Sequence, residues 1–137
     1  MPIMEQPQQH ISVGDRNFST LQTVVAVAAT SATRQTLITP TAGFRVRILS
    51  VQVVTRGLTT NPDRVGVYFS DGAAYTTTAA KAIGEFVPGT TGMQEMTWPD
   101  GTGPVGAVDD VVSGITESET ELLMRYTITY RLERPNT

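Results

Sequence analysis

Residues 121–133 alternate between polar and apolar side chains with a period of two. The apolar members of this run are Leu122, Met124, Tyr126, Ile128, Tyr130 and Leu132. Charged residues and threonines fill the positions between them, with Leu123 as the exception. Successive side chains of a β-strand point to opposite faces, whereas a helix would spread these apolar positions around all its sides. The run therefore predicts a long antiparallel strand with one buried face.

A second run, residues 44–55, changes phase halfway along. Its apolar positions are even-numbered at first and odd-numbered afterwards: Phe44, Val46, Ile48, Leu49, Val51 and Val53. A β-bulge adds one residue to a strand, so both halves of this run could direct their apolar side chains to the same face of a sheet. The pattern predicts a β-bulge or a bend near Ile48. The alternative is a strand that is buried on both faces beyond this point, which would suit an interface.

Six further extended runs are separated by turn residues such as Asp-Gly and Pro-Gly pairs. They span residues 22–30, 34–39, 64–70, 82–87, 93–98 and 108–115. No amphipathic helix interrupts them, and about eight strands at a spacing of roughly 8–14 residues are typical of sandwiches, jelly rolls and barrels. We therefore predict an all-β chain: a single antiparallel, jelly-roll-like β-sandwich over residues 21–137, preceded by an extended N-terminal arm over residues 1–20.

Composition excludes several classes of partner. The net charge is −3, and nucleic-acid binding needs clustered Lys and Arg, so no nucleic-acid partner is expected. No apolar run approaches the ~20 residues that span a bilayer, so no membrane partner is expected. The N-terminus lacks the features of a secretory signal, which predicts synthesis in the cytoplasm. Charged residues make up 17% of the chain against a typical ~25%, which suggests that another molecule covers part of the surface.

The inventory of chemically reactive residues is poor. The chain has no Cys, which removes disulfides, thiolate catalysis and sulfur-ligated metals. His10, the sole histidine, lies in the arm, so neither a zinc site nor a Ser-His-Asp triad is expected. Asp100, Asp109 and Asp110 border a Gly-rich loop that could hold calcium, but turn chemistry accounts for them without a metal. We therefore expect no cofactor.

Three alternating carboxylates, Glu117, Glu119 and Glu121, would share one face of a strand. Paired carboxylates can support acid–base chemistry or glycoside cleavage, but these roles need a pocket that separates their pKa values. No such pocket is indicated nearby, so a solvated rim is the better interpretation. We expect no enzymatic activity.

Two features predict contacts with other molecules. Trp98, the sole tryptophan, can cap the core, anchor an interface or, least favoured, stack on a sugar ring. The arm has too few apolar residues to form a core, but enough to anchor it in a neighbour's groove. The predicted interface residues are Ile3, Met4, Ile11, Val13, Phe18 and Trp98.

The segments 44–51 and 67–72 and the closing strand 126–130, in a cysteine-free chain with a polar arm, resemble the head decoration (cement) proteins of tailed bacteriophages. The resemblance spans residues from about 20 to 133. It implies a virion structural protein without catalytic residues, a homotrimer that sits on the capsid surface. It also implies the major capsid protein as partner, often clamped through the N-terminal arm. The alternatives are a carbohydrate- or receptor-binding module of a phage tail or surface appendage and, least favoured, a small hydrolase.

Overall fold

The computed structural model describes residues 19–29, 32–70, 72, 81–118 and 123–135. Within these residues the chain forms strands and no helix. The strands are β1 (Gln22–Val27), β2 (Gln35–Ile38), β3 (Arg45–Thr55), β4 (Val65–Phe69), β5 (Ala82–Phe86), β6 (Gly92–Thr97), β7 (Val112–Thr116) and β8 (Arg125–Glu133). Each overlaps one of the extended runs predicted from the sequence.

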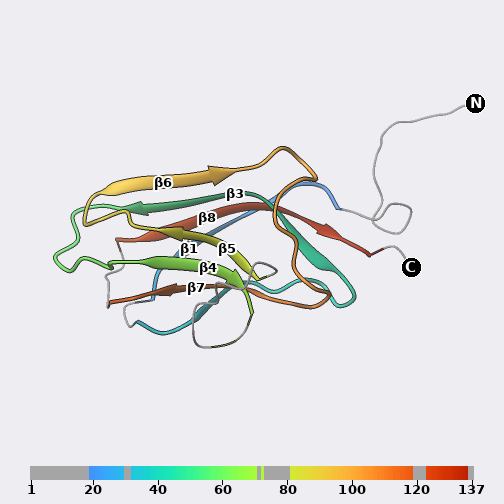
Figure 1. The fold of residues 1–137 in the computed structure, drawn as a ribbon, viewed down its shortest axis with the longest axis horizontal. Helices are drawn as coiled ribbons and strands as arrows, with labels where there is room; N and C mark the ends of the chain where they lie inside the picture. Colours follow the sequence, from blue (N-terminus) through green and yellow to red (C-terminus); the bar gives the residue numbers. More distant parts are fainter. Residues whose placement is uncertain (1–18, 30–31, 71, 73–80, 119–122, 136–137) are drawn as a thin grey trace, which may run out of the picture.

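The strands pair as if one long antiparallel ribbon had been rolled up. The first strand pairs with the last, and each following strand pairs with the next one in from the other end: β1 with β8, β2 with β7, β3 with β6 and β4 with β5. Contacts of β3 with β8 and of β4 with β7 then complete two four-stranded sheets, of order β1-β8-β3-β6 and β2-β7-β4-β5. In Figure 1, β6, β3 and β8 lie above β4 and β7. This order is that of a jelly roll, so the predicted fold class is confirmed.

β8 lies between β1 and β3 and carries the alternation found in the sequence. Tyr126 and Ile128 are buried in the core, and Tyr130 and Leu132 pack against it partly buried. The predicted core face is therefore right. The strand begins at Arg125 rather than at residue 121. Residues 119–122 lie outside the described residues.

β3 contains the predicted bulge. Ile48 lies opposite Tyr130 and Ser50 lies opposite Thr129, so Leu49 is the extra residue. The core therefore receives even-numbered side chains before Leu49 and odd-numbered ones after it, as the change of phase required. Within the chain itself the outward residues beyond the bulge are half-buried, so the alternative of a strand buried on both faces, which would need an interface, stays a prediction.

The predicted strand over residues 108–115 starts later, at Val112. Asp109 has a φ of 69°, in the left-handed region that ends extended structure. Its carboxylate accepts a hydrogen bond from the Gly43 backbone N–H at 2.8 Å, which holds the turn against the preceding part of the sandwich. Residues 108–111 are therefore a turn that leads into β7.

The Gly-rich loop after β6 lies against the first half of β3. Gly106 N donates to Val46 O at 3.1 Å, and Ile48 N donates to Pro104 O at 2.9 Å. A Cβ on Gly103 would lie 1.9 Å from the Ile48 carbonyl oxygen, closer than atoms can approach. Glycine is needed here for close backbone approach, a reason that the interpretation of this loop as simple turns did not supply.

Candidate functional site

The three aspartates considered for calcium are held separately. Arg131 donates to Asp100 from Nε at 2.9 Å and from Nη2 at 2.6 Å, and these hydrogen bonds lower the pKa of the Asp100 carboxyl. Asp109 caps the turn at Gly43, and Asp110 pairs with Lys81 at 2.5 Å. Turn and ion-pair geometry thus accounts for each carboxylate by itself. The described part of the chain holds no cluster of three metal-ligating side chains.

The carboxylates considered for catalysis are not assembled into a site. Glu117 is exposed and pairs with Arg64 at 3.2 Å, and this hydrogen-bonded pair lowers the pKa of the Glu117 carboxyl. Arg64 also bridges to Glu85 at 3.2 Å, which joins the ends of β4, β5 and β7. Glu119, Glu121 and the sole histidine, His10, lie outside the described residues.

Trp98 is partly buried and packs against the hydrophobic core just after β6. Its backbone N–H donates to Leu49 O at 2.8 Å, which fixes it beside the bulge of β3. The position is that of a core cap with one exposed side, and its predicted part in an interface stays a prediction. The other predicted interface residues, Ile3, Met4, Ile11, Val13 and Phe18, lie outside the described residues.

The outer face of the sheet β1-β8-β3-β6 is low in charge. Three rows of side chains cross it: Val27, Arg125, Val54 and Met93; Val25, Thr127, Gln52 and Glu95; and Thr23, Thr129, Ser50 and Thr97. Only Arg125 and Glu95 in these rows carry a charge. Val25 is 61% exposed and Met93 57% exposed. Four of these twelve side chains are apolar, Val25, Val27, Val54 and Met93, and exposed apolar side chains that gather in this way make the face a candidate contact surface.

Charged residues are concentrated at one end of this face. Glu133 accepts from Arg47 Nε at 2.8 Å and also pairs with Arg45 at 3.3 Å. Arg47 reaches further, to the Gly103 carbonyl at 2.9 Å, and so ties β3 to the Gly-rich loop. These contacts make the charged end a stabilised part of the domain, so the low-charge rows are the better candidate for contact.

The edge strand β6 is exposed along almost its whole length, on the side turned to the outer face and on the side turned inward. Because Thr97 lies opposite Ser50 and Trp98 N donates to Leu49 O, the even-numbered residues of β6 direct their backbone groups to β3. The N–H and C=O groups of Met93, Glu95 and Thr97 consequently point to the free edge. Natural sheets block such an edge with charged side chains, especially Lys, with Pro or with a bulge, and of these β6 contains only one charged residue, Glu95.

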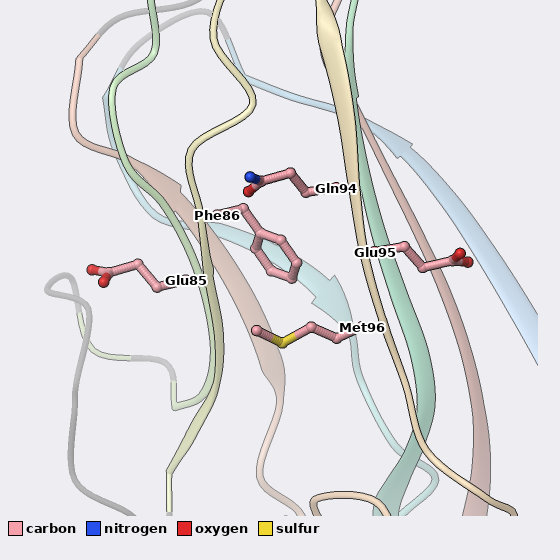
Figure 2. A pocket seen from close by; sticks show the side chains of 5 residues that line it. All are labelled: Glu85, Phe86, Gln94, Glu95 and Met96. Atoms are coloured by element: carbon pink, nitrogen blue, oxygen red, sulfur yellow. The ribbon is translucent and has the colours of Figure 1, made fainter.

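An open hollow of about 420 Å³ separates β6 from β5, the edge strand of the other sheet. Figure 2 shows Phe86, Gln94 and Met96 gathered in it, while Glu85 and Glu95 point away on opposite sides. Phe86 is 2% exposed and belongs to the core, so the hollow reaches down to the core between the sheets. The Gln94 amide oxygen accepts from Val87 N at 2.6 Å, which braces one end of the hollow.

The sequence pattern predicts the strand β6 but not its position at an open edge of the sheet. Neither its composition nor its neighbours in the chain reveal which strands flank it, since β3 lies about forty residues earlier. The pair of exposed methionines in a short strand is the one local signal, because methionine is frequent at interfaces.

Comparison with models of protein families gives no match, and neither does comparison with curated proteins. Solved structures give partial matches. A chain of the capsid structure of the Helicobacter pylori bacteriophage KHP30 is 16% identical, with a TM-score of 0.47, over 86% of this chain and 90% of its own length. A chain of the cyanophage Pam1 capsid asymmetric unit is 14% identical, with a TM-score of 0.43, over 98% of this chain and 100% of its own.

A third match is a chain from Bacillus endospore appendages, described as disulfide-linked pili. It is 14% identical, with a TM-score of 0.46, over 95% of this chain and 100% of its own. The assignment of the jelly roll rests on the strand order of the protein itself. The part of the chain that the structure describes includes no helical segment that could span a bilayer.

Proposed function

We propose that the protein is a virion structural protein that decorates and stabilises a bacteriophage capsid by binding its surface as a homotrimer, with the major capsid protein as partner. The observation that carries the proposal is the low-charge outer face of the sheet β1-β8-β3-β6, with Val25 and Met93 more than half exposed. A jelly roll with such a face has a surface suited to repeated contacts between protein subunits.

The mechanism is thermodynamic. A protein that binds the assembled lattice, but not its free subunits, stabilises the lattice by mass action. Closed symmetry among three copies presents three equivalent faces to the lattice at once, and this multivalency raises the affinity beyond that of one copy. No step requires a catalytic group, and we propose that the protein is not an enzyme.

The predicted arm spans residues 1 to about 20; Ser19 is bound to β8 of its own domain, so in this proposal the residues before Ser19 contact another chain. The apolar residues of the arm act as anchors, together with Trp98 at the rim of the domain. Ordering an extended segment costs conformational entropy, so its affinity depends on these anchors and on main-chain pairing with a free strand edge.

Deletion of residues 1–17 tests the proposal. The thermal midpoint of the domain should stay nearly unchanged, because the core lies between the two sheets. Binding to capsids that lack the protein, measured by co-sedimentation, should weaken by at least ~10-fold, or ~1.4 kcal/mol. Equal binding by the truncated and full chains would refute the role of the arm, and absence of binding by the full chain would refute the proposed function.

A further inference from the structure

The open edge of the sandwich between β5 and β6 has the properties of a binding site for one added strand. β6 offers three residues with outward backbone donors and acceptors, and the hollow beneath it offers space for side chains on the inner face. A strand that adds to such an edge gains main-chain hydrogen bonds along its length, and pockets select its alternate side chains.

We propose that this edge binds residues 8–13 of a second copy of the chain as an antiparallel strand. The inference rests on the proposed function, in which the arm contacts another chain, and it names the surface that receives the arm. Antiparallel addition is the commoner arrangement.

The composition of residues 8–13, Gln-Gln-His-Ile-Ser-Val, fits the site. Ile11 and Val13 alternate with Ser12, so two apolar side chains point inward when Ser12 points outward. Pro7, which has no backbone N–H, and Gly14 bracket the segment, whose six residues match the length of β6.

The register follows from the hydrogen-bonding pattern. The backbone N–H and C=O of Glu95 point to the free edge, and its side chain points to the outer face of the sheet. A residue of the added strand that pairs with Glu95 therefore also directs its side chain to the outer face. Ser12 takes that position, and Ile11 and Val13 then lie over Met96 and Gln94, in the hollow above Phe86.

Charge supports the same segment. Of the two carboxylates at the hollow, Glu95 lies opposite the added strand, whereas Glu85 points away and pairs with Arg64. Residues 8–13 contain no acidic side chain, whereas Glu5 and Asp15 lie outside the segment on either side. An added strand of this composition avoids placing like charges opposite one another, which would be destabilising.

In this arrangement the arm of the same chain is too short to occupy the edge of β6. Ser19 is fixed to β8 at its C-terminal end, where Ser19 N donates to Leu132 O at 2.7 Å and Leu132 N donates to Ser19 Oγ at 3.0 Å. The added residue opposite Gln94 would lie about 28 Å from Ser19. This distance combines four strand spacings across the sheet with the six residues along β8 from Leu132 to Tyr126. The six steps from Val13 to Ser19 span at most about 21 Å. The arm must therefore come from another copy.

Cross-linking of full-length chains tests the proposal, and because the chain has no Cys, each introduced thiol is unique. Ser12→Cys chains are mixed with Glu95→Cys chains at the highest soluble concentration and treated with a short bismaleimide. A covalent dimer of the two variants is expected. Thr23→Cys, on the exposed opposite edge of the same sheet, replaces Glu95→Cys as the matched control and should lower the yield by ~10-fold or more.

Sedimentation of a second set of variants tests the same contact without cross-linker. Glu95→Pro removes an N–H that β3 does not use, whereas Glu95→Thr keeps it. Glu95→Pro and Ile11→Asp should shift the protein towards lighter species, and Glu95→Thr and Ser12→Asn should not.

Equal cross-linking to Thr23→Cys would overturn the proposal, and so would an intramolecular product in the double variant Ser12→Cys/Glu95→Cys. Absence of the cross-link, together with loss of particle binding on deletion of residues 1–17, would also overturn it. The last result would assign the arm to the capsid protein and leave the proposed function standing.

Discussion

Replacing Ile128 with alanine tests the core of the jelly roll at its most central strand. Ile128 is fully buried on β8 and lies between Val24 of β1 and Val51 of β3. The change removes three carbon atoms, worth about 0.8 kcal/mol each, or about 2.4 kcal/mol of transfer free energy. A cavity flanked by two ordered strands relaxes only partly, so the total loss should be about 3–4 kcal/mol.

Urea unfolding followed by the fluorescence of Trp98 measures this loss, since Trp98 is the sole tryptophan and packs against the core. The midpoint should fall while the slope with urea stays unchanged, which indicates that the same surface is exposed on unfolding. Thr127→Ala, on the outward face of the same strand, is the matched control and should cost less than about 1 kcal/mol. A loss below about 0.5 kcal/mol for Ile128→Ala would refute the assignment of this face to the core.

Three further variants probe contacts that hold the domain together. Gly103→Ala places a Cβ against the Ile48 carbonyl and should lower the free energy of unfolding by about 1–3 kcal/mol. An unchanged stability in thermal unfolding would show that the loop can move away from β3 without cost. Glu133→Gln leaves the guanidinium groups of Arg45 and Arg47 without their carboxylate and should lower the free energy of unfolding by about 1–3 kcal/mol in the same assay. No loss of stability would show that water replaces the carboxylate. Asp100 has its pKa lowered by Arg131, so its contribution is present above the unfolded pKa of about 4 and lost as the pH falls through the folded one. Asp100→Asn should therefore flatten the acid side of the profile of melting temperature against pH, and an unaltered profile would contradict the pairing.

Local patterns in the sequence were sufficient to predict the strands, because alternation and turn residues are properties of short segments. The alternation around Ile128 identified the core face, and the change of phase at Ile48 identified the bulge at Leu49. The start of β7 was predicted too early because Val108, which precedes the left-handed turn at Asp109, was counted with the valines that follow the turn.

The open edge could not be predicted, because it depends on which strands are neighbours in space. β6 pairs with β3 through contacts between residues far apart in the chain, and the two methionines of β6 do not indicate which side of the strand is free. The need for glycine at position 103 has the same origin, since the atom it avoids belongs to β3. The interface residues of the arm stay predictions.

Electron cryo-microscopy of phage particles purified from the natural source of the chain tests the proposed function most directly. A two-sheet jelly roll of about 15 kDa is expected on the capsid surface, in groups of three, with the sheet β1-β8-β3-β6 in contact with neighbouring subunits. Particles that lack the protein, or that carry it at the tail tip as single copies, would contradict the proposed function.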